Sequence, residues 1–167
     1  MKILKYLLVV AVCFTFHGCK VNYSFTGITD MPESFQVNFF RNTADIIEPG
    51  LDLLFTNSLQ DYIVNQTSAS LVNNGGEVIY EGEIVEYRIS PMTATADNTA
   101  AQNRLTISVN VRFINSKDPE KDFETRFSFY YDYPAESQLS GSIQATAFDE
   151  IIERLTQDIL NASLADW

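Results

Sequence analysis

The sequence predicts an α+β fold in which two helices pack on one face of a four-stranded, mainly antiparallel sheet, in the order β-α-β-β-β-α. Two segments place apolar residues at helical spacing, and four segments alternate apolar and polar residues as strands do. Each amphipathic helix needs an apolar sheet face to cover, which puts both helices on the same side of the sheet. The chain of 167 residues shows no internal repeat, so its folded part is expected to be one domain.

The first strand and the first helix follow from two short patterns. Residues Ser34–Asn42 alternate in polarity, which predicts a strand. Its apolar face would hold Phe35, Val37 and Phe39. The segment Glu48–Thr67 predicts an amphipathic helix with the apolar residues Leu51, Leu54, Phe55, Leu59, Tyr62 and Ile63. A turn is expected at Asn73–Glu77, because Asn and Gly tolerate positive φ.

Three longer strands are predicted in the middle of the chain. In Glu77–Ser90 the parity of the alternation changes near Gly82–Val85, and a β-bulge there would restore one buried face. The apolar residues are Val78, Tyr80 and Ile84 before the change, and Val85, Tyr87 and Ile89 after it. Residues Arg104–Asn115 and Lys121–Tyr133 are joined by a polar turn and are expected to form a hairpin. Its inward residues would be Leu105, Ile107, Val109, Val111, Phe113, Phe123, Phe127, Phe129 and Tyr131.

A loop of small and polar residues is expected at Pro91–Asn103, between the first long strand and the hairpin. The last element is a helix within Ser142–Trp167. Its apolar stripe consists of Phe148, Ile151, Ile152, Leu155, Ile159 and Leu160. The opposite face is largely charged, as expected for a helix that covers a sheet on one side only.

The N-terminal segment has the pattern of a secretory signal. Lys2 and Lys5 begin it, an apolar run continues to Phe16, and Gly18 precedes Cys19. The Gly-Cys pair resembles the lipobox of bacterial lipoproteins, although Phe16 stands where that motif prefers Leu. We expect residues 1–18 to be a signal peptide, Cys19 to carry the lipid, residues 19–34 to form a tether and residues 35–167 to form the domain. The alternatives are an ordinary signal peptide with an incidental cysteine, or a buried N-terminal helix.

Composition excludes several classes of function. The net charge is −11, and it would be −13 after loss of the signal peptide, which argues against binding nucleic acid. The sequence has one histidine, His17, and two cysteines, Cys13 and Cys19. If His17 and Cys13 leave with the signal, the mature chain has no disulfide, no Cys/His zinc site and no Ser-His-Asp triad. No metal and no cofactor other than the lipid is expected.

Several stretches resemble the LptE family of outer-membrane lipoproteins. They are "YSFTG" after the lipid site, "YEGEI" in the long strand, "LTISVNVRFINSKDPEKDFETRFSFYYDY" across the hairpin and the terminal "LADW". The resemblance implies a non-enzymatic plug and folding partner of the LptD β-barrel, and a role in receiving lipopolysaccharide on its way to the cell surface. Lys20, directly after the lipid site, is not the aspartate that in lipoprotein sorting tends to signal retention at the inner membrane, so the resemblance to lipoproteins implies an outer-membrane location on the periplasmic side. The alternative is a lipoprotein that activates a cell-wall synthase or assists another lipid transporter.

Candidate contact residues lie on the face of the predicted hairpin that points away from the core. They are Arg104, Asn110, Arg112 and Arg126. Arginine suits phosphate and carboxylate groups, so these residues would contact lipopolysaccharide phosphates or a protein partner. The competing interpretation is that these are ordinary exposed arginines paired with neighbours such as Glu124 or Asp132.

An acidic group in the first long strand offers the one enzymatic alternative. Glu81 and Glu83 share a strand face, with Glu86 close by, and paired carboxylates can serve glycosidase chemistry. A solvated acidic surface explains the same residues more simply, and no catalytic residue is predicted.

Overall fold

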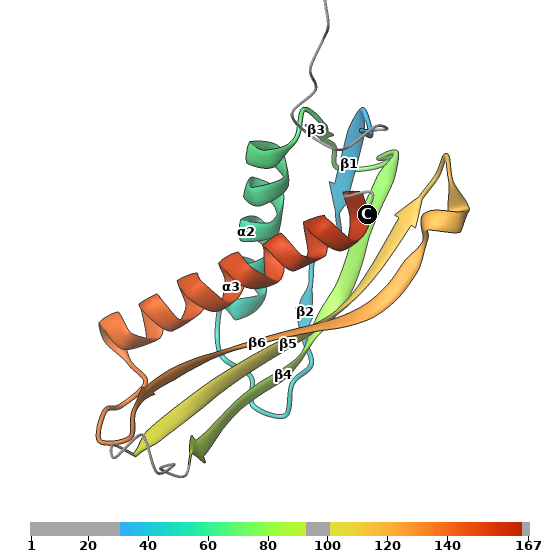
Figure 1. The fold of residues 1–167 in the computed structure, drawn as a ribbon. Coiled ribbons are helices and arrows are strands. Elements are labelled where there is room, and N and C mark those ends of the chain that lie inside the picture. Colours follow the sequence, from blue (N-terminus) through green and yellow to red (C-terminus); the bar gives the residue numbers. More distant parts are fainter. Residues whose placement is uncertain (1–30, 93–100, 165–167) are drawn as a thin grey trace, which may run out of the picture.

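The computed structural model describes residues 31–92 and 101–164, in which two helices cover one face of a six-stranded sheet (Figure 1). The helices are α2 (Leu51–Gln66) and α3 (Gly141–Leu164). The predicted α+β class and the placement of both helices on one face are confirmed. The expected signal peptide, Cys19 and the tether up to residue 30 lie outside the described residues. No helix in 31–92 or 101–164 is long and apolar enough to span a membrane.

The sheet is mixed and has more strands than the four expected. Its order is β3-β1-β4-β5-β6, and β2 pairs beside β1 on the same edge of β4. The long strands β4 (Val78–Met92), β5 (Gln102–Asn115) and β6 (Phe123–Pro134) are antiparallel. The short strands β1 (Ser34–Val37), β2 (Arg41–Asn42) and β3 (Ser70–Leu71) form parallel pairs. The chain passes through α2 between β1 and β4, and such a helical crossover brings two strands into parallel order.

The predicted strand over 34–42 is broken, and one of its apolar assignments is wrong. Phe39 is 51% exposed, whereas its neighbour Phe40 is fully buried. β1 ends at Val37, and the backbone N–H of Phe40 donates a 3.1 Å hydrogen bond to Oγ1 of Thr56 in α2. The Phe40 ring packs edge-on against Phe55 with centroids 5.1 Å apart. Contact with α2 therefore overrides the strand alternation at this point.

The predicted bulge in β4 is confirmed. The register with β5 shifts between Ile84 and Glu86, so Val85 is the extra residue. Ile84 and Tyr87 are consequently both buried on the helix side. Ile89, which shares the parity of Tyr87, is 43% exposed.

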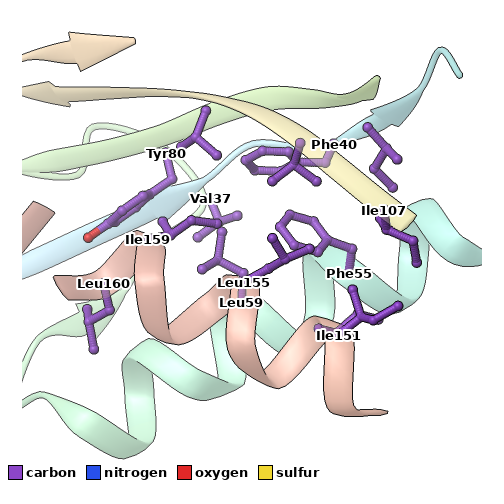
Figure 2. Packing of buried hydrophobic residues seen from close by; sticks show 14 of the residues in the cluster. Val37, Phe40, Phe55, Leu59, Tyr80, Ile107, Ile151, Leu155, Ile159 and Leu160 are labelled. Carbon is purple, nitrogen blue, oxygen red and sulfur yellow. The ribbon is translucent and has the colours of Figure 1, made fainter. Parts of the chain in front are cut away.

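The core lies between the helices and the sheet (Figure 2). All six residues of the predicted α3 stripe are buried. They meet Phe55 and Leu59 of α2 and Tyr80 of β4, whose hydroxyl lies 2.8 Å from Oγ of Ser163. Burial raises the pKa of Tyr80, which stays neutral. Leu54 of the predicted α2 stripe is 39% exposed, so the buried face of α2 is narrower than expected.

A short 3-10 helix, η1 (Pro119–Lys121), completes the turn between β5 and β6. The hairpin is confirmed in a register that runs from Gln102–Pro134 to Phe113–Phe123 without a shift. On the core face of the hairpin, the predicted inward residues of β5 are fully buried. Four aromatic residues of β6 on the same face are only half-buried. They are Phe123, Phe127, Phe129 and Tyr131. The edge strand is thus less completely covered than the sequence pattern suggests.

Candidate functional site

The candidate site is the side of β4, β5 and β6 that faces away from the helices, here called the polar sheet face. Cross-strand register places its residues in rows across the three strands. It comprises Glu81, Glu83, Glu86, Arg88, Arg104, Thr106, Ser108, Asn110, Arg112, Glu124, Arg126, Ser128, Tyr130 and Asp132. No described helix covers this face, in contrast to the opposite one (Figure 1).

The β4 bulge creates the centre of the polar sheet face. Strict alternation from Ile84 would turn Glu86 toward the core, because residues two apart share a face. The extra residue Val85 instead brings Glu86 opposite Ser108, on the polar side. The bulge that keeps the core apolar therefore also places a partly covered carboxylate on the polar side in mid-sheet.

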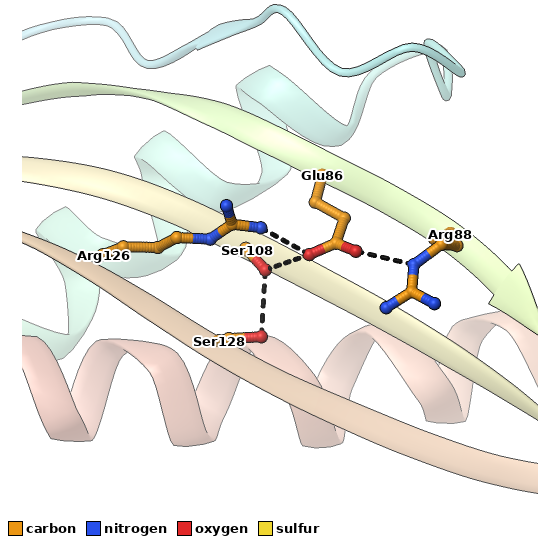
Figure 3. A network of polar contacts seen from close by, with 5 residues as sticks. All are labelled: Glu86, Arg88, Ser108, Arg126 and Ser128. Atoms are coloured by element: carbon orange, nitrogen blue, oxygen red, sulfur yellow. Dashed lines mark hydrogen bonds and ion pairs between the residues drawn. The ribbon is translucent and has the colours of Figure 1, made fainter.

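Glu86 accepts hydrogen bonds from three side chains (Figure 3). Its Oε1 lies 2.7 Å from Nε of Arg88, and its Oε2 lies 2.7 Å from Oγ of Ser108 and 2.5 Å from Nη2 of Arg126. The Ser108 hydroxyl is fully buried and lies 2.9 Å from Oγ of Ser128. Hydrogen bonds from Arg88 and then Ser108 hold the pKa of Glu86 below its ordinary value, so the carboxylate remains charged.

One end of the face is fixed by Arg104. Its guanidinium makes a two-pronged contact with Asp132, with Nε–Oδ1 and Nη2–Oδ2 distances of 2.7 and 2.8 Å. Its Cζ also lies 3.6 Å from the centre of the Tyr130 ring, in cation–π geometry. The hydrogen bond with Asp132 raises the pKa of Arg104. Both charged side chains are about three-quarters covered, so this pair is held more firmly than a typical surface pair.

The other end forms a shallow depression. It is lined by Glu81, Gly82, Glu83, Asn110, Val111, Arg112 and Glu124. Arg112 contacts Glu81 at 3.3 Å, and the amide of Asn38 donates to the other oxygen of Glu81 at 3.2 Å. The depression offers both hydrogen-bond donors and carboxylate acceptors to a ligand.

All four predicted contact residues lie on this face, and each arginine among them has a carboxylate partner. Arg104 pairs with Asp132, as the competing interpretation anticipated, while Arg112 and Arg126 pair with glutamates of β4. The acidic group Glu81, Glu83 and Glu86 thus occupies the same face as the arginines.

The balance of charge on the polar sheet face was not evident from the hairpin alone. The face holds four arginines, Arg88 included, against five carboxylates. Each of its four arginines pairs with a carboxylate, so the face is not a positive patch. Arg88 was not predicted from the sequence, and the signal that could have found it is the parity change at the bulge. The Ser108–Ser128 pair was not predicted either, and it depends on the hairpin register. Within 31–92 and 101–164, no group of three or more His, Cys, Asp or Glu side chains could hold a metal ion.

Comparison with known protein families gives a match to one family. The model of the LptE family, described as lipopolysaccharide-assembly, matches residues 33–163. This range includes every residue of the polar sheet face. Comparison with curated protein sequences gives no match.

Several solved structures share the fold at low sequence identity. A minor lipoprotein from Acinetobacter baumannii is 11% identical, with a TM-score of 0.51 over 81% of this chain and 94% of that one. A hypothetical protein from Chlamydia trachomatis is 10% identical, with a TM-score of 0.55 over 81% and 99%. The solution structure of uncharacterized lipoprotein B from Nitrosomonas europaea is 15% identical, with a TM-score of 0.50 over 86% and 88%. At these identities the likeness concerns the fold alone.

Proposed function

This chain belongs to the LptE family of lipopolysaccharide-assembly proteins, and we propose that it acts as the plug and assembly partner of the LptD β-barrel in the outer membrane. We further propose that it is anchored there through a lipid on Cys19, on the periplasmic side. The family is non-enzymatic, so its role would be to bind and position other molecules rather than to catalyse a reaction.

The observation that carries this proposal is the uncovered polar sheet face. A sheet with one helix-covered face and one open face presents a broad, rigid surface. Arg112, Arg126 and Tyr130 project from it with exposures of 59%, 54% and 46%. Arginine and tyrosine are enriched in protein interfaces, where they supply much of the binding energy. This face is suited to docking against a protein wall.

Charge pairing favours a protein contact over a phosphate contact for Arg104, Arg112 and Arg126, and Asn110 lies among them on the same face. A lipid phosphate would approach a face with five carboxylates and would have to compete with them for each guanidinium. A protein partner can instead satisfy both the arginines and the glutamates by complementary pairs. We therefore propose that these four residues contact the barrel.

Affinity purification of the full chain from its own envelope in mild detergent tests the partner. We expect a large β-barrel protein in stoichiometric amount by mass spectrometry. Recovery of a cell-wall synthase or an inner-membrane transporter would replace the barrel proposal with the alternative role. Recovery of the chain without any envelope protein would contradict both.

A pair of matched variants tests the surface. Arg112→Ala removes an exposed arginine from the polar sheet face, and Arg154→Ala removes a similarly exposed, ion-paired arginine from α3. Exposed ion pairs contribute little to stability, so both variants should fold. We expect Arg112→Ala to lower barrel recovery several-fold relative to Arg154→Ala. Equal recovery of the barrel by the two variants would contradict a place for the polar sheet face in the interface. If Arg112→Ala lost binding to purified lipopolysaccharide but not to the barrel, Arg112 would be assigned to a lipid phosphate.

A further inference from the structure

The outer edge of β6 is a long, regular strand edge without a partner among the described residues. β6 has 12 residues, pairs with β5 along its inner edge without a register shift and is the last strand of the sheet order. Its outer edge presents a row of backbone N–H and C=O groups that are available for pairing. The opposite end of the sheet is β3, which has only two residues.

β6 lacks several of the usual protections of an edge strand, although it carries the charged residues Glu124, Arg126 and Asp132. Proteins block edge pairing with charged side chains, lysine above all, and with proline, bulges or very short strands. Residues 123–133 contain no lysine and no proline, and the only proline of β6 is its last residue, Pro134. On the helix side, the edge carries the half-buried aromatic row of Phe123, Phe127, Phe129 and Tyr131. Further apolar area at this edge would be buried if another strand were added.

We propose that β6 pairs antiparallel with β6 of a second copy of this chain, in a register centred on Phe129. Pairing of one edge with itself is isologous, so each contact occurs twice. If odd-numbered residues of one β6 lie opposite odd-numbered residues of the other, both helix layers lie on the same side of the joined sheet. The aromatic rows of the two copies then meet. This inference does not depend on the barrel partner.

Charge complementarity selects the register. Centring on Phe129 places Arg126 opposite Asp132 in both halves and Phe127 opposite Tyr131. Centring on Ser128 instead would oppose Glu124 and Asp132, two like charges, twice. Centring on Tyr130 would leave Arg126 opposite Pro134 and would shorten the ladder. Opposite charges across strands stabilise pairing and like charges oppose it, so the Phe129-centred register is favoured.

The existing ion pairs leave room for this arrangement. Arg126 reaches Glu86 through Nη2, and a guanidinium has five N–H donors, so it can also contact a carboxylate of the second copy. α3 passes Phe129 of β6 and crosses the sheet toward β4, where Ser163 meets Tyr80 (Figure 1), so near the pairing axis the two copies of α3 would be separated by about two strand spacings. That distance is roughly 10 Å, which is the separation of neighbouring packed helices.

Charge-swap variants test both the pairing and its register. The full chain in mild detergent is followed by size-exclusion chromatography with light scattering over a concentration series. We expect the mass of the wild-type protein to double as concentration rises. Arg126→Asp and Asp132→Arg should each remain monomeric when alone. Their equimolar mixture should dimerise again, because each introduced charge then faces its complement and native Arg126 faces native Asp132.

The control is Arg41→Asp, which makes the same change in net charge as Arg126→Asp but lies in β2, on the side of β4 away from β6, and should dimerise as the wild type does. Circular dichroism of each variant establishes that it is folded. A wild-type mass that stays monomeric at all concentrations would overturn the proposal whatever the variants do. A dimer that survives both single substitutions would overturn the register. A self-pairing chain that recovers no barrel would leave this inference standing and contradict the proposed function.

Discussion

At the scale of single residues, Glu86 shows how one irregular position determines a surface. The bulge at Val85 moves Glu86 from the apolar parity to the polar one, where Arg88, Ser108 and Arg126 surround it. The buried Ser108 hydroxyl needs a hydrogen-bond partner, and the carboxylate supplies it. A charged group in the middle of a sheet is therefore fixed by its neighbours rather than merely solvated.

Glu86→Gln tests this network through the pH dependence of stability. The pKa of Glu86 is lowered in the folded chain, so its charged form stabilises the fold above the ordinary value of 4.5, and this contribution is lost as pH falls through the lowered pKa. At pH 7 we expect the substitution to reduce the free energy of unfolding by about 1–2 kcal/mol. The measurement is urea unfolding of both proteins between pH 7 and pH 3.

The difference between wild type and Glu86→Gln should shrink below pH 4.5. Glu77 also has a lowered pKa, because of its hydrogen bond with Lys117, but it is present in both proteins and cancels in the comparison. A difference that is constant across the whole pH range would show that the carboxylate charge does not stabilise the fold.

At the scale of elements, the long strands and α3 follow from the sequence, and the short strands do not. The α3 stripe and the hairpin each repeat one period over a dozen or more residues, which a pattern can identify. β2 and β3 have two residues each, too few to show alternation. The parallel pairing of β1 and the burial of Phe40 in place of Phe39 depend on contact with α2, which no local pattern contains.

The candidate site was predicted only in part, because a local pattern shows the face of a strand but not its neighbours in the sheet. Strand parity placed Arg104, Asn110, Arg112 and Arg126 on one face, and the hairpin register bears out that placement. The ion pairs of Arg112 and Arg126 involve β4, which lies beside β5 only in the folded sheet. Charge balance on a sheet face is set by strand order, and strand order was open from the sequence.

Gly82 provides a prediction about the pairing of β4 and β5. A Cβ atom at this position would overlap the backbone carbonyl oxygen of Asn110 and lie 2.8 Å from Cε1 of Phe40. Gly82→Ala must therefore spread the strands or displace a buried ring. We expect a loss of about 1–3 kcal/mol in the free energy of unfolding, as for other overpacked sites. Chemical denaturation measures it, with Thr125→Ala, an exposed position of β6, as the control. If Gly82→Ala leaves the free energy of unfolding unchanged, the pairing of β4 with β5 adjusts to the added methyl group without cost.

At the scale of the whole molecule, charge is distributed unevenly between the two layers. The polar sheet face is close to balance, whereas the helix layer is acidic. The groove between α2 and α3 is bordered by Asp61, Asp149 and Glu153, and the only basic residue of the two helices is Arg154. With a net charge of −11, repulsion among the acids of the helix layer opposes the compact state.

Salt should therefore stabilise this protein. Raising the ionic strength from 0.01 to 0.3 M shortens the screening length from about 30 Å to below 10 Å and weakens repulsion between separated acids more than it weakens close ion pairs. We expect a gain on the order of 1 kcal/mol, or roughly 2–4 °C in Tm. Asp149→Asn combined with Glu153→Gln should reduce this gain, because both acids border the α2–α3 groove. A fall in Tm with salt would instead show that the ion pairs of the polar sheet face dominate the electrostatic free energy.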